Sequence, residues 1–452
     1  MHRISPLALL ASLSLILSLG APALADNPPG WYSRQFSGAY EKHGRHSPKW
    51  DDSARTAVRY AQIVWSRPNA WLDDAEDQAY AAAAEARRKG CTDPLIDYIH
   101  MRFGFEIGLV ATSAVQDRCN QIADEMEKAG YPGYDKAVAS LYAAYATRLR
   151  DAGEEGLKKA QNDLERGEES VAEAFGDADI PQEQVTSLLA DEDAAARRLK
   201  ADWKPQFERA CLALETNHPK SSLPLLAKGV FSTYYAWDGR GVNYSDKVTN
   251  EQWALFEERL KTAEETLEAA WKADSGNSEI AARMISVELG QGRGRDRMEL
   301  WFKRAMEADP NNDFACCSKL TYLLPRWHGN DDEALAFAQE CLEGDNWKAR
   351  IPFILDDYYQ YESSKDMAPR EVPLYNQIGV WEQIQSLYDL YLKVCPLSNR
   401  DRSRYAYLAC LSGHWSMAAT QLQILGDHVW PSQFNGKFDE MRKKIPALPK
   451  SG

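Results

Sequence analysis

Apolar residues recur at intervals of three and four along most of the chain, the spacing of helices that bury one face. The first such pattern begins near Asp51 and stops before Pro68, and an alanine-rich stretch follows it. Next, Thr92 or Asp93 fits the cap of another helix, with Pro94 in its first turn. Short loops between such segments are typical of antiparallel helical neighbours. The fold class that we expect is therefore all-α.

The stretch from Gly153 to Lys200 keeps the helical period but contains few large apolar residues. A helix with so thin an apolar stripe buries little area. We expect exposed charged helices here, or a helical hairpin that turns at Gly176 to Pro181, acting as a solvated connector or as an interaction surface. The pattern breaks at Thr216 to Pro219. We therefore expect an N-terminal helical region over 51–216 and a second region over 217–430.

From Ser221 onward, helical pairs recur at a nearly constant interval. The second helix of each pair carries a small residue, a bulky one four positions later, and in most pairs a small one three positions after that. Small residues let the two helices of a pair touch, while the bulky one fills the space between pairs. The last small residues, Ala270, Ala305 and Cys341, are 35 and 36 residues apart. The matching positions are Ala263, Leu267 and Ala270; Met298, Phe302 and Ala305; Ala334, Ala338 and Cys341; and, near the end, Ala418, Leu422 and Leu425.

Residues 221–427 resemble tetratricopeptide (TPR) repeats, with residues 282–312 as the best-preserved unit. More narrowly, residues 90–103, 234–260 and 281–330 are similar to exported bacterial proteins of a helical-repeat family of unknown function. The resemblance implies a TPR-like α-solenoid, and it carries no known activity or catalytic residues. Stacked repeats of this kind curve, and their concave face is the usual binding surface.

Other parts of the chain lack a clear period. Residues 26–50 are rich in Gly, Pro, Ser and His and predict an irregular linker or an arm lying on the fold. Residues 346–371 predict an insertion or a degenerate helical pair. Residues 431–452 predict a C-terminal tail with a short polar helix.

The first 25 residues have the pattern of a secretory signal peptide. Arg3 precedes an apolar run from Leu7 to Leu19, and the small residues Ala23 and Ala25 suit cleavage after Ala25. An uncleaved membrane anchor is the alternative, but the run is short for a span. We expect a secreted or periplasmic protein with no membrane insertion after cleavage.

Length and charge narrow the classes of protein further. At 452 residues the chain exceeds a usual single core, so two domains or one extended solenoid are expected. The formal net charge of −14 argues against a nucleic-acid partner. No polybasic patch for anionic lipid is present either.

The eight cysteines leave the redox state open. An oxidising compartment permits disulfides, and Cys91 with Cys119 and Cys395 with Cys410 are the candidate pairs by loop length. Several cysteines also sit where a helical repeat accepts a small apolar residue. No C-x-x-C motif is present, which argues against a thioredoxin-type site.

The motifs of common catalytic sites are missing from the sequence. There is no H-E-x-x-H, no G-x-S-x-G and no phosphate-binding G-x-x-x-x-G-K-[ST]. The glycines at 290, 292 and 294 are interpreted as a turn between helices. Asp356 and Asp357 beside two tyrosines could mimic a glycosidase pair, but adjacency in sequence does not supply the required geometry. We therefore assign no catalytic residue, cofactor or metal.

Two aromatic clusters are candidate binding sites. The first either closes the core of the first repeat or forms an aromatic and arginine-lined patch for a peptide or glycan, since such side chains dominate binding hot spots. In the second, Pro325 is expected to end a helix early, which places Trp327 and His328 on an extended loop at the solenoid edge. The first cluster contains Tyr234, Tyr235, Trp237, Arg240, Tyr244 and Trp253, and the second contains Arg326, Trp327 and His328 between Pro325 and Asn330.

The sequence thus predicts an exported non-catalytic scaffold that binds a protein or peptide partner through the concave face of a TPR-like solenoid. The alternative is a hydrolase, or an accessory protein of envelope carbohydrate metabolism, acting at the aromatic and arginine patch.

Overall fold

The structure is a computed structural model and describes residues 29–66, 74–146, 153–241, 243, 245–365 and 373–445. Within these ranges the regular elements are helices, and no strand occurs among them. The predicted all-α class is therefore confirmed. The predicted signal peptide lies outside the described residues. The chain forms two compact units: unit 1 from residues 1–44 and 116–330, and unit 2 from residues 45–115 and 331–452.

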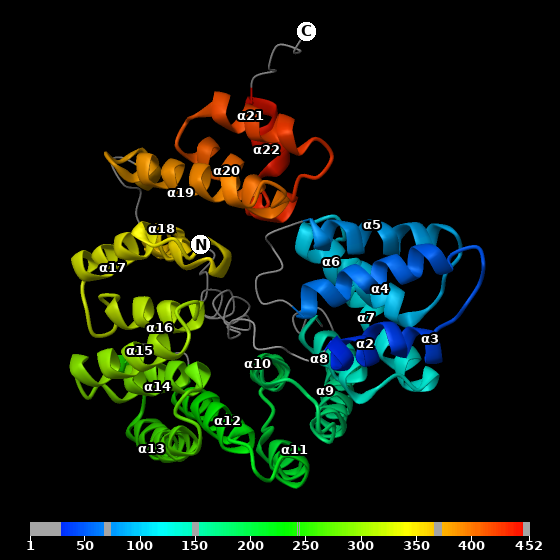
Figure 1. The fold of residues 1–452 in the computed structure, drawn as a ribbon, viewed down its shortest axis with the longest axis horizontal. Helices are drawn as coiled ribbons and strands as arrows, with labels where there is room; N and C mark the ends of the chain where they lie inside the picture. Colours follow the sequence, from blue (N-terminus) through cyan, green and yellow to red (C-terminus); the bar gives the residue numbers. More distant parts are fainter. Residues whose placement is uncertain are drawn as a thin grey trace. The chain divides into compact units, whose positions relative to one another are not determined.

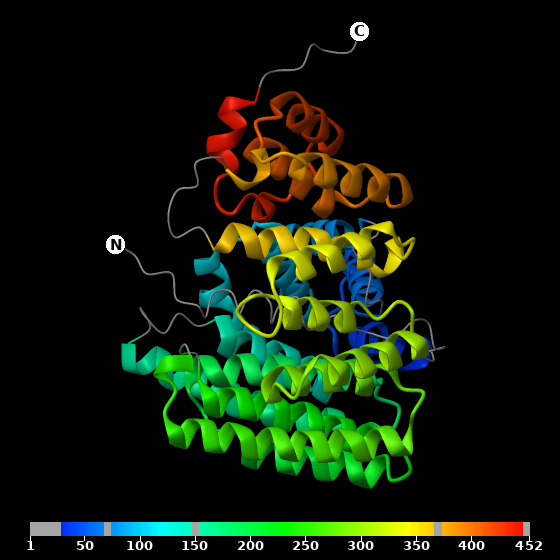
Figure 2. The same cartoon turned by 90° about the vertical axis from the view of Figure 1, so that its left-hand side faces the viewer.

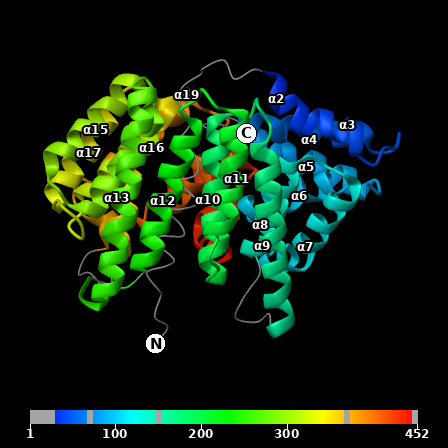
Figure 3. The same ribbon diagram turned by 90° about the horizontal axis from the view of Figure 1, so that it is seen from below.

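Unit 1 contains the helices of the first predicted candidate site and most of the predicted repeats (Figures 1 and 3). Figure 3 shows α8 to α11 side by side. Its helices are α2 (Pro29–Ser33), the π-helical turn η2 (Arg34–Gly38), α3 (Ala39–His43), α7 (Thr112–Ala129, whose first residues fall in unit 2), α8 (Gly133–Ala146), α9 (Gly153–Phe175), α10 (Gln182–Leu199), α11 (Lys204–Asn217), α12 (Leu223–Arg240), the 3₁₀ turn η4 (Ser245–Lys247), α13 (Asn250–Ala273), α14 (Ser278–Gln291), α15 (Arg295–Ala308) and α16 (Asp313–Leu323).

Unit 2 joins helices from two distant stretches of sequence. Its elements are α4 (Asp51–Ser66), α5 (Ala75–Arg88), α6 (Pro94–Ile107), α17 (Asp331–Glu343), the 3₁₀ turns η5 (Trp347–Ala349) and η6 (Ile351–Phe353), α18 (Ile354–Ser364), η7 (Leu374–Asn376), α19 (Val380–Val394), α20 (Asn399–Leu411), α21 (Trp415–Leu425), η8 (Pro431–Phe434) and α22 (Phe438–Lys444).

Three turns between consecutive helices share one hydrogen-bonding pattern. The residue after α13, α15 or α19 donates its N–H to the carbonyl four positions back, and the residue that precedes the next helix donates to the carbonyl three positions back. In unit 1, Asn277 and Asn312 then cap α14 and α16 with their side chains, as short polar residues do at helix N-termini. In Figure 2 the green helices of this part lie one against the next. The two bonds of each turn are Asp274–Ala270 and Asn277–Asp274 (2.9 and 3.3 Å), Asp309–Ala305 and Asn312–Asp309 (2.9 and 3.2 Å), and Cys395–Tyr391 and Ser398–Cys395 (2.8 and 3.3 Å).

The small residues of the predicted pairs are buried as expected. Ala263, Ala270, Ala305, Ala334 and Ala338 are fully buried on the second helices of their pairs. One predicted position is wrong. Phe302 was predicted to be the bulky residue that fills the space between pairs, but it is only half-buried. On α15 the bulky buried residue is its neighbour Trp301, which is 4% exposed. The aliphatic stem of Lys319 brings its ammonium over the Phe302 ring at 4.2 Å instead.

The expectation of irregular structure is wrong for residues 29–43, which are helical. The aromatic residues of this segment are spaced so that they share one helical face, and the turn-forming residues between them obscured that period. Trp31, Tyr32, Phe36 and Tyr40 are all buried. Trp31 donates its indole N–H to Asp177 at 3.0 Å. The segment is therefore part of the core of unit 1, anchored on the α9–α10 turn.

The charged region over 153–200 forms a helical hairpin, which was one of the two predicted arrangements, but it is not a solvated connector. Leu164, Val171 and Phe175 of α9 are buried. A Cβ at Gly167 would lie 2.7 Å from the Leu141 side chain of α8. Because Gly167 has no side chain, the backbone of α9 approaches the Leu141 side chain of α8 closely. This close approach buries the narrow apolar stripe of α9.

Residues 347–364 are also more regular than expected, since they form two 3₁₀ turns and α18. Asp93 is the cap of α6, and its side chain accepts the N–H groups of Leu95 and Ile96 at 3.0 and 3.3 Å. The short polar helix predicted near the C-terminus is α22.

The eight cysteines are thiols in this structure, and neither candidate pair forms a disulfide. Cys119 and Cys410 are buried within helices as small apolar residues. Cys91 is buried just before the cap of α6, and burial raises the pKa of its thiol to about 11. Thiols held in this way serve packing, since the reactive thiolate form is disfavoured.

Candidate functional site

The two aromatic clusters that were predicted separately meet in unit 1. The ring of Trp237, in the last turn of α12, contacts the ring of Trp327 edge to face, with centroids 5.4 Å apart and planes at 83°. Phe256 of α13 makes a second edge contact with Trp237 at 4.8 Å. We call Trp237, Arg240, Trp253, Phe256 and Trp327 the tryptophan cluster. Such edge-to-face pairs contribute beyond the area that they bury.

Arg240 joins the two helices of this cluster. Its guanidinium lies 5.7 Å from the centroid of Trp237 and 5.1 Å from that of Trp253. One Nη1 donates to the carbonyls of Gly241 and Asn243, both at 3.2 Å. Burial lowers the pKa of Arg240 from its ordinary value, which still leaves the group charged at neutral pH. The cluster therefore presents a cation between two indole rings.

The start of α13 is what fixes Trp253. Thr249 and Gln252 form a reciprocal capping box, in which Thr249 Oγ1 accepts the Gln252 N–H and Gln252 Oε1 accepts the Thr249 N–H. This cap sets the first turn of the helix, so that Trp253 and Phe256 project from it three residues apart.

Trp327 lies in a tight turn rather than on the extended loop that the sequence suggested. The Trp327 N–H donates to Leu324 at 2.8 Å and the His328 N–H donates to Tyr322 at 3.1 Å. A Cβ at Gly329 would collide with the backbone of Leu323, so this return of the chain requires glycine. The prediction of an extended loop is therefore wrong, because hydrogen bonds fold the segment back onto α16.

His328 holds this turn against α14. Its Nε2 lies 2.8 Å from the carbonyl of Leu289, and the ring packs on Tyr322 at 4.5 Å. Nε2 can donate to that carbonyl only when it carries a hydrogen, as it does in one of the two neutral tautomers of histidine. Gly292 adopts φ +61°, and a Cβ there would lie 3.0 Å from the His328 ring. The glycines around 290–294 thus form a turn that accommodates His328.

The indole N–H of Trp327 is buried and has no hydrogen-bond acceptor among the residues that the structure describes. Buried donors are nearly always paired. Arg326, next to it, is exposed, with its guanidinium 5.9 Å from the Trp327 ring. The exposed guanidinium of Arg326 beside this ring is suited to a ligand that brings acceptor oxygens.

Tyr234 and Tyr235 do not join the cluster. The hydroxyl of Tyr234 accepts from Arg283 at 3.2 Å, and its carbonyl accepts from Arg197 at 2.7 Å. Tyr235 lies under the guanidinium of Arg259, 3.3 Å from the ring centroid. Both tyrosines therefore serve the packing of α10, α12, α13 and α14. Tyr244 lies outside the described residues.

Sequence reasoning missed a second arginine–tryptophan group in unit 1. The guanidinium of Arg304 lies 4.4 Å from the ring of Trp301 and 5.5 Å from that of Trp271, and these two rings meet edge to face. The signal was present, since Trp301 and Arg304 are one helical turn apart. The repeat pattern on this helix was assigned to the neighbouring residues Met298, Phe302 and Ala305 instead.

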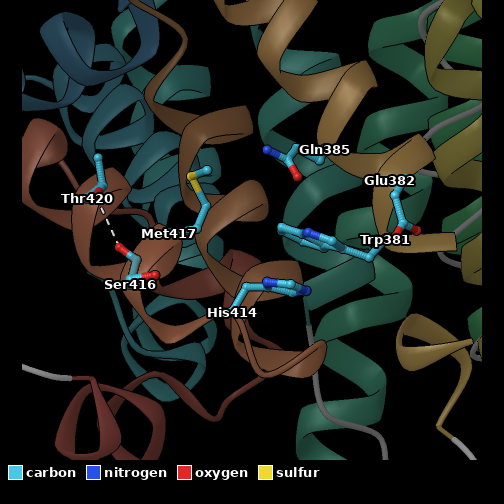
Figure 4. A pocket seen from close by; sticks show the side chains of 7 residues that line it. All are labelled: Trp381, Glu382, Gln385, His414, Ser416, Met417 and Thr420. Carbon is cyan, nitrogen blue, oxygen red and sulfur yellow. Dashed lines mark hydrogen bonds between the residues drawn. The ribbon is translucent and has the colours of Figure 1, made fainter. Parts of the chain in front are cut away.

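A shallow pocket of about 440 Å³ in unit 2 was also missed (Figure 4). Residues of α19 form one side and residues of α21 the other, with His414 in the turn before α21. Trp381 stacks on His414 with centroids 4.3 Å apart and planes at 12°. The lining residues are Trp381, Glu382, Gln385, His414, Ser416, Met417 and Thr420.

The neighbouring carboxylates Asp356 and Asp357 lie on α18. Asp356 accepts from Tyr388 and Gln360, both at 3.2 Å, and pairs with Arg404 at 3.4 Å. Burial, together with the charge of Asp356, raises the pKa of Asp357 to about 7. Because Asp356 already bonds to neighbouring helices, this pair is accounted for by the packing of α18.

No group of three or more His, Cys, Asp or Glu side chains able to hold a metal ion occurs in the described ranges. In the same residues, no helix combines the length and the apolar character needed to cross a membrane.

No known protein-family model matches this sequence, and no curated protein matches it at a significant level. The resemblance to exported helical-repeat proteins therefore stays a prediction.

Proposed function

We propose that the protein is an exported scaffold, without catalytic activity of its own, that binds a protein or peptide partner. In this proposal the helical pairs stack as in a TPR-like solenoid. The shared turn after α13, α15 and α19 supports that stacking, because the same backbone geometry recurs after these three helices. The small residues Ala270 and Ala305, which occupy equivalent positions on α13 and α15 and are buried, also support this stacking.

The observation that carries the proposal is the tryptophan cluster. Trp and Arg are the residues that most often dominate the energy of protein interfaces. Here Trp237 and Trp327 are in contact, Arg240 lies over Trp237, and the exposed Arg326 lies beside Trp327. A peptide offers apolar side chains to the rings, and acidic side chains or backbone carbonyls to the guanidinium groups.

Capture experiments from an envelope extract test this proposal. The Arg240→Ala and Trp327→Ala proteins should lose a partner that the unaltered protein retains. Arg304→Ala is the matched control, since Arg304 also lies over two indole rings in unit 1. Equal capture by all four proteins, or no captured protein at all, would contradict the proposal.

A substrate panel on the purified protein separates this proposal from the hydrolase or accessory alternative. Turnover that a single carboxylate substitution abolishes would establish the enzyme instead.

A further inference from the structure

One side of the pocket between α19 and α21 is formed by stacked aromatic side chains, which we call the aromatic wall. His414, Trp381, Tyr405 and Tyr388 form a column of stacked rings, with successive centroids 4.3, 6.0 and 5.1 Å apart and planes within 21° of parallel. Trp381, Tyr405 and Tyr388 are buried, whereas His414 is exposed at the end of the column. The wall is thus held rigidly from behind, and its outer ring faces the pocket (Figure 4).

The rest of the lining is rich in hydrogen-bond acceptors. Glu382 contributes a carboxylate and Gln385 an amide oxygen. Ser416 and Thr420 contribute hydroxyl oxygens. The Thr420 hydroxyl donates its proton to the Ser416 carbonyl at 3.0 Å, so the lone pairs of the Thr420 oxygen remain available to a ligand. No lysine or arginine is among these lining residues. A ligand that fits must therefore supply donors.

The charge of Glu382 is not neutralised within the described residues. Its side chain is exposed, and no cation of the described chain forms an ion pair with it. By contrast, Asp401 of the same unit is paired with Arg350 at 2.7 Å. The first turn of α19 partly stabilises Glu382, since the helix N-terminus favours an anion. The carboxylate still has capacity for a cation.

We infer that this pocket binds the cationic side chain of a basic peptide, with arginine as the best fit. The planar guanidinium stacks on the exposed imidazole of His414 and donates to the Glu382 carboxylate. Arginine suits the site because its five N–H donors are fixed in a plane and stack on aromatic rings. The volume of about 440 Å³ lies in the range of small-ligand pockets.

An anionic ligand is disfavoured by the same lining. It would meet the Glu382 carboxylate and find no basic partner among the lining residues. The net charge of −14 adds to this preference, since the field of the whole protein attracts cations.

The test uses the full mature chain with ¹³C-labelled methionine methyl groups. Met417 lines the pocket, so its methyl signal reports binding directly, and Met417→Leu assigns that signal. The probes are two blocked tripeptides, acetyl-Gly-Arg-Gly-amide and the same peptide with citrulline, which has arginine's shape without its charge. The arginine peptide should shift the Met417 signal in a saturable way and bind about three- to fivefold more tightly than the citrulline peptide.

Glu382→Gln should lower the affinity for the arginine peptide by a similar factor and remove the preference over citrulline. Asp427→Asn is the control, because Asp427 is an exposed carboxylate beyond the opposite end of α21. Trp327→Ala should leave this binding unchanged, which separates the inference from the proposed function of the tryptophan cluster. Equal affinity for the two peptides, equal effects of the two acidic substitutions, or an unmoved Met417 signal would overturn the inference.

Discussion

The indole N–H of Trp430 donates to the carboxylate of Asp77 at 3.2 Å, across 353 positions of sequence. Asn399 of α20 donates to the same carboxylate, also at 3.2 Å. Asp77 lies on α5 and Trp430 just before η8, so this bond joins the early and late segments of unit 2. The compactness of unit 2 therefore depends on contacts that only the folded chain brings together.

Replacing Trp430 by Phe should destabilise the protein by about 2–3 kcal/mol, because a hydrogen bond to a charged group is lost and the smaller ring leaves buried space unfilled. Chemical denaturation monitored by circular dichroism measures this change. Trp415→Phe is the control, since its indole N–H has no partner in the described chain. Equal losses for the two variants would show that the Asp77 bond contributes nothing.

Gly108 makes the second close contact between these segments. It adopts φ +93°, and a Cβ there would lie 2.6 Å from the backbone nitrogen of Ser432. Gly108→Ala should cost about 2–4 kcal/mol, because it combines backbone strain with a collision against main chain. Gly413→Ala separates the two effects, since Gly413 has φ +74° but open space around it. Thermal melting should show the larger loss for Gly108→Ala, and the reverse order would refute the close approach.

Glu168 of α9 makes stability depend on pH. Burial first, and then the charge of Glu165, raise its pKa to about 8. The folded protein therefore keeps a proton that the unfolded chain releases near its ordinary value of 4.5. Because the folded state binds more protons in this window, its stability falls as pH rises from about 4.5 to about 8.

Glu168→Gln should remove this loss and stabilise the protein by about 2–4 kcal/mol at pH 8, with little effect at pH 4. Melting temperatures across that range measure it. Glu169→Gln is the matched control, because Glu169 is the adjacent carboxylate and is exposed. An unchanged slope of stability against pH in the Glu168→Gln protein would contradict the raised pKa of this buried carboxyl.

Much of the helical framework is predictable from local pattern. The cap and proline at Asp93 and Pro94 and the small residues Ala270 and Ala305 all behave as their spacing indicates. Those features depend on contacts within a helix or between consecutive helices. The burial of residues 29–43 was not predictable in the same way, since their partners, such as Asp177, lie far along the chain.

The same limit applies to the candidate site. The residue types of both aromatic clusters were recognisable, yet their contact depends on how the turn after α16 docks on α14. That docking rests on Gly329, and on the bond from His328 to Leu289. Neither is visible as a motif. The stack of Trp381 on His414 was not predictable for a related reason, because Trp381 lies on α19 and His414 in the turn before α21.

Photo-crosslinking beside the tryptophan cluster tests the central claim most directly. A photo-reactive amino acid replaces Arg326, which is exposed and adjacent to Trp327, in cells that produce the protein. Leu212, an exposed residue of α11 at 63%, is the control position in the same unit. A discrete protein adduct at position 326 that is absent at position 212 is the predicted result. No adduct at 326, or the same adducts at both positions, would contradict a partner-binding role for this cluster.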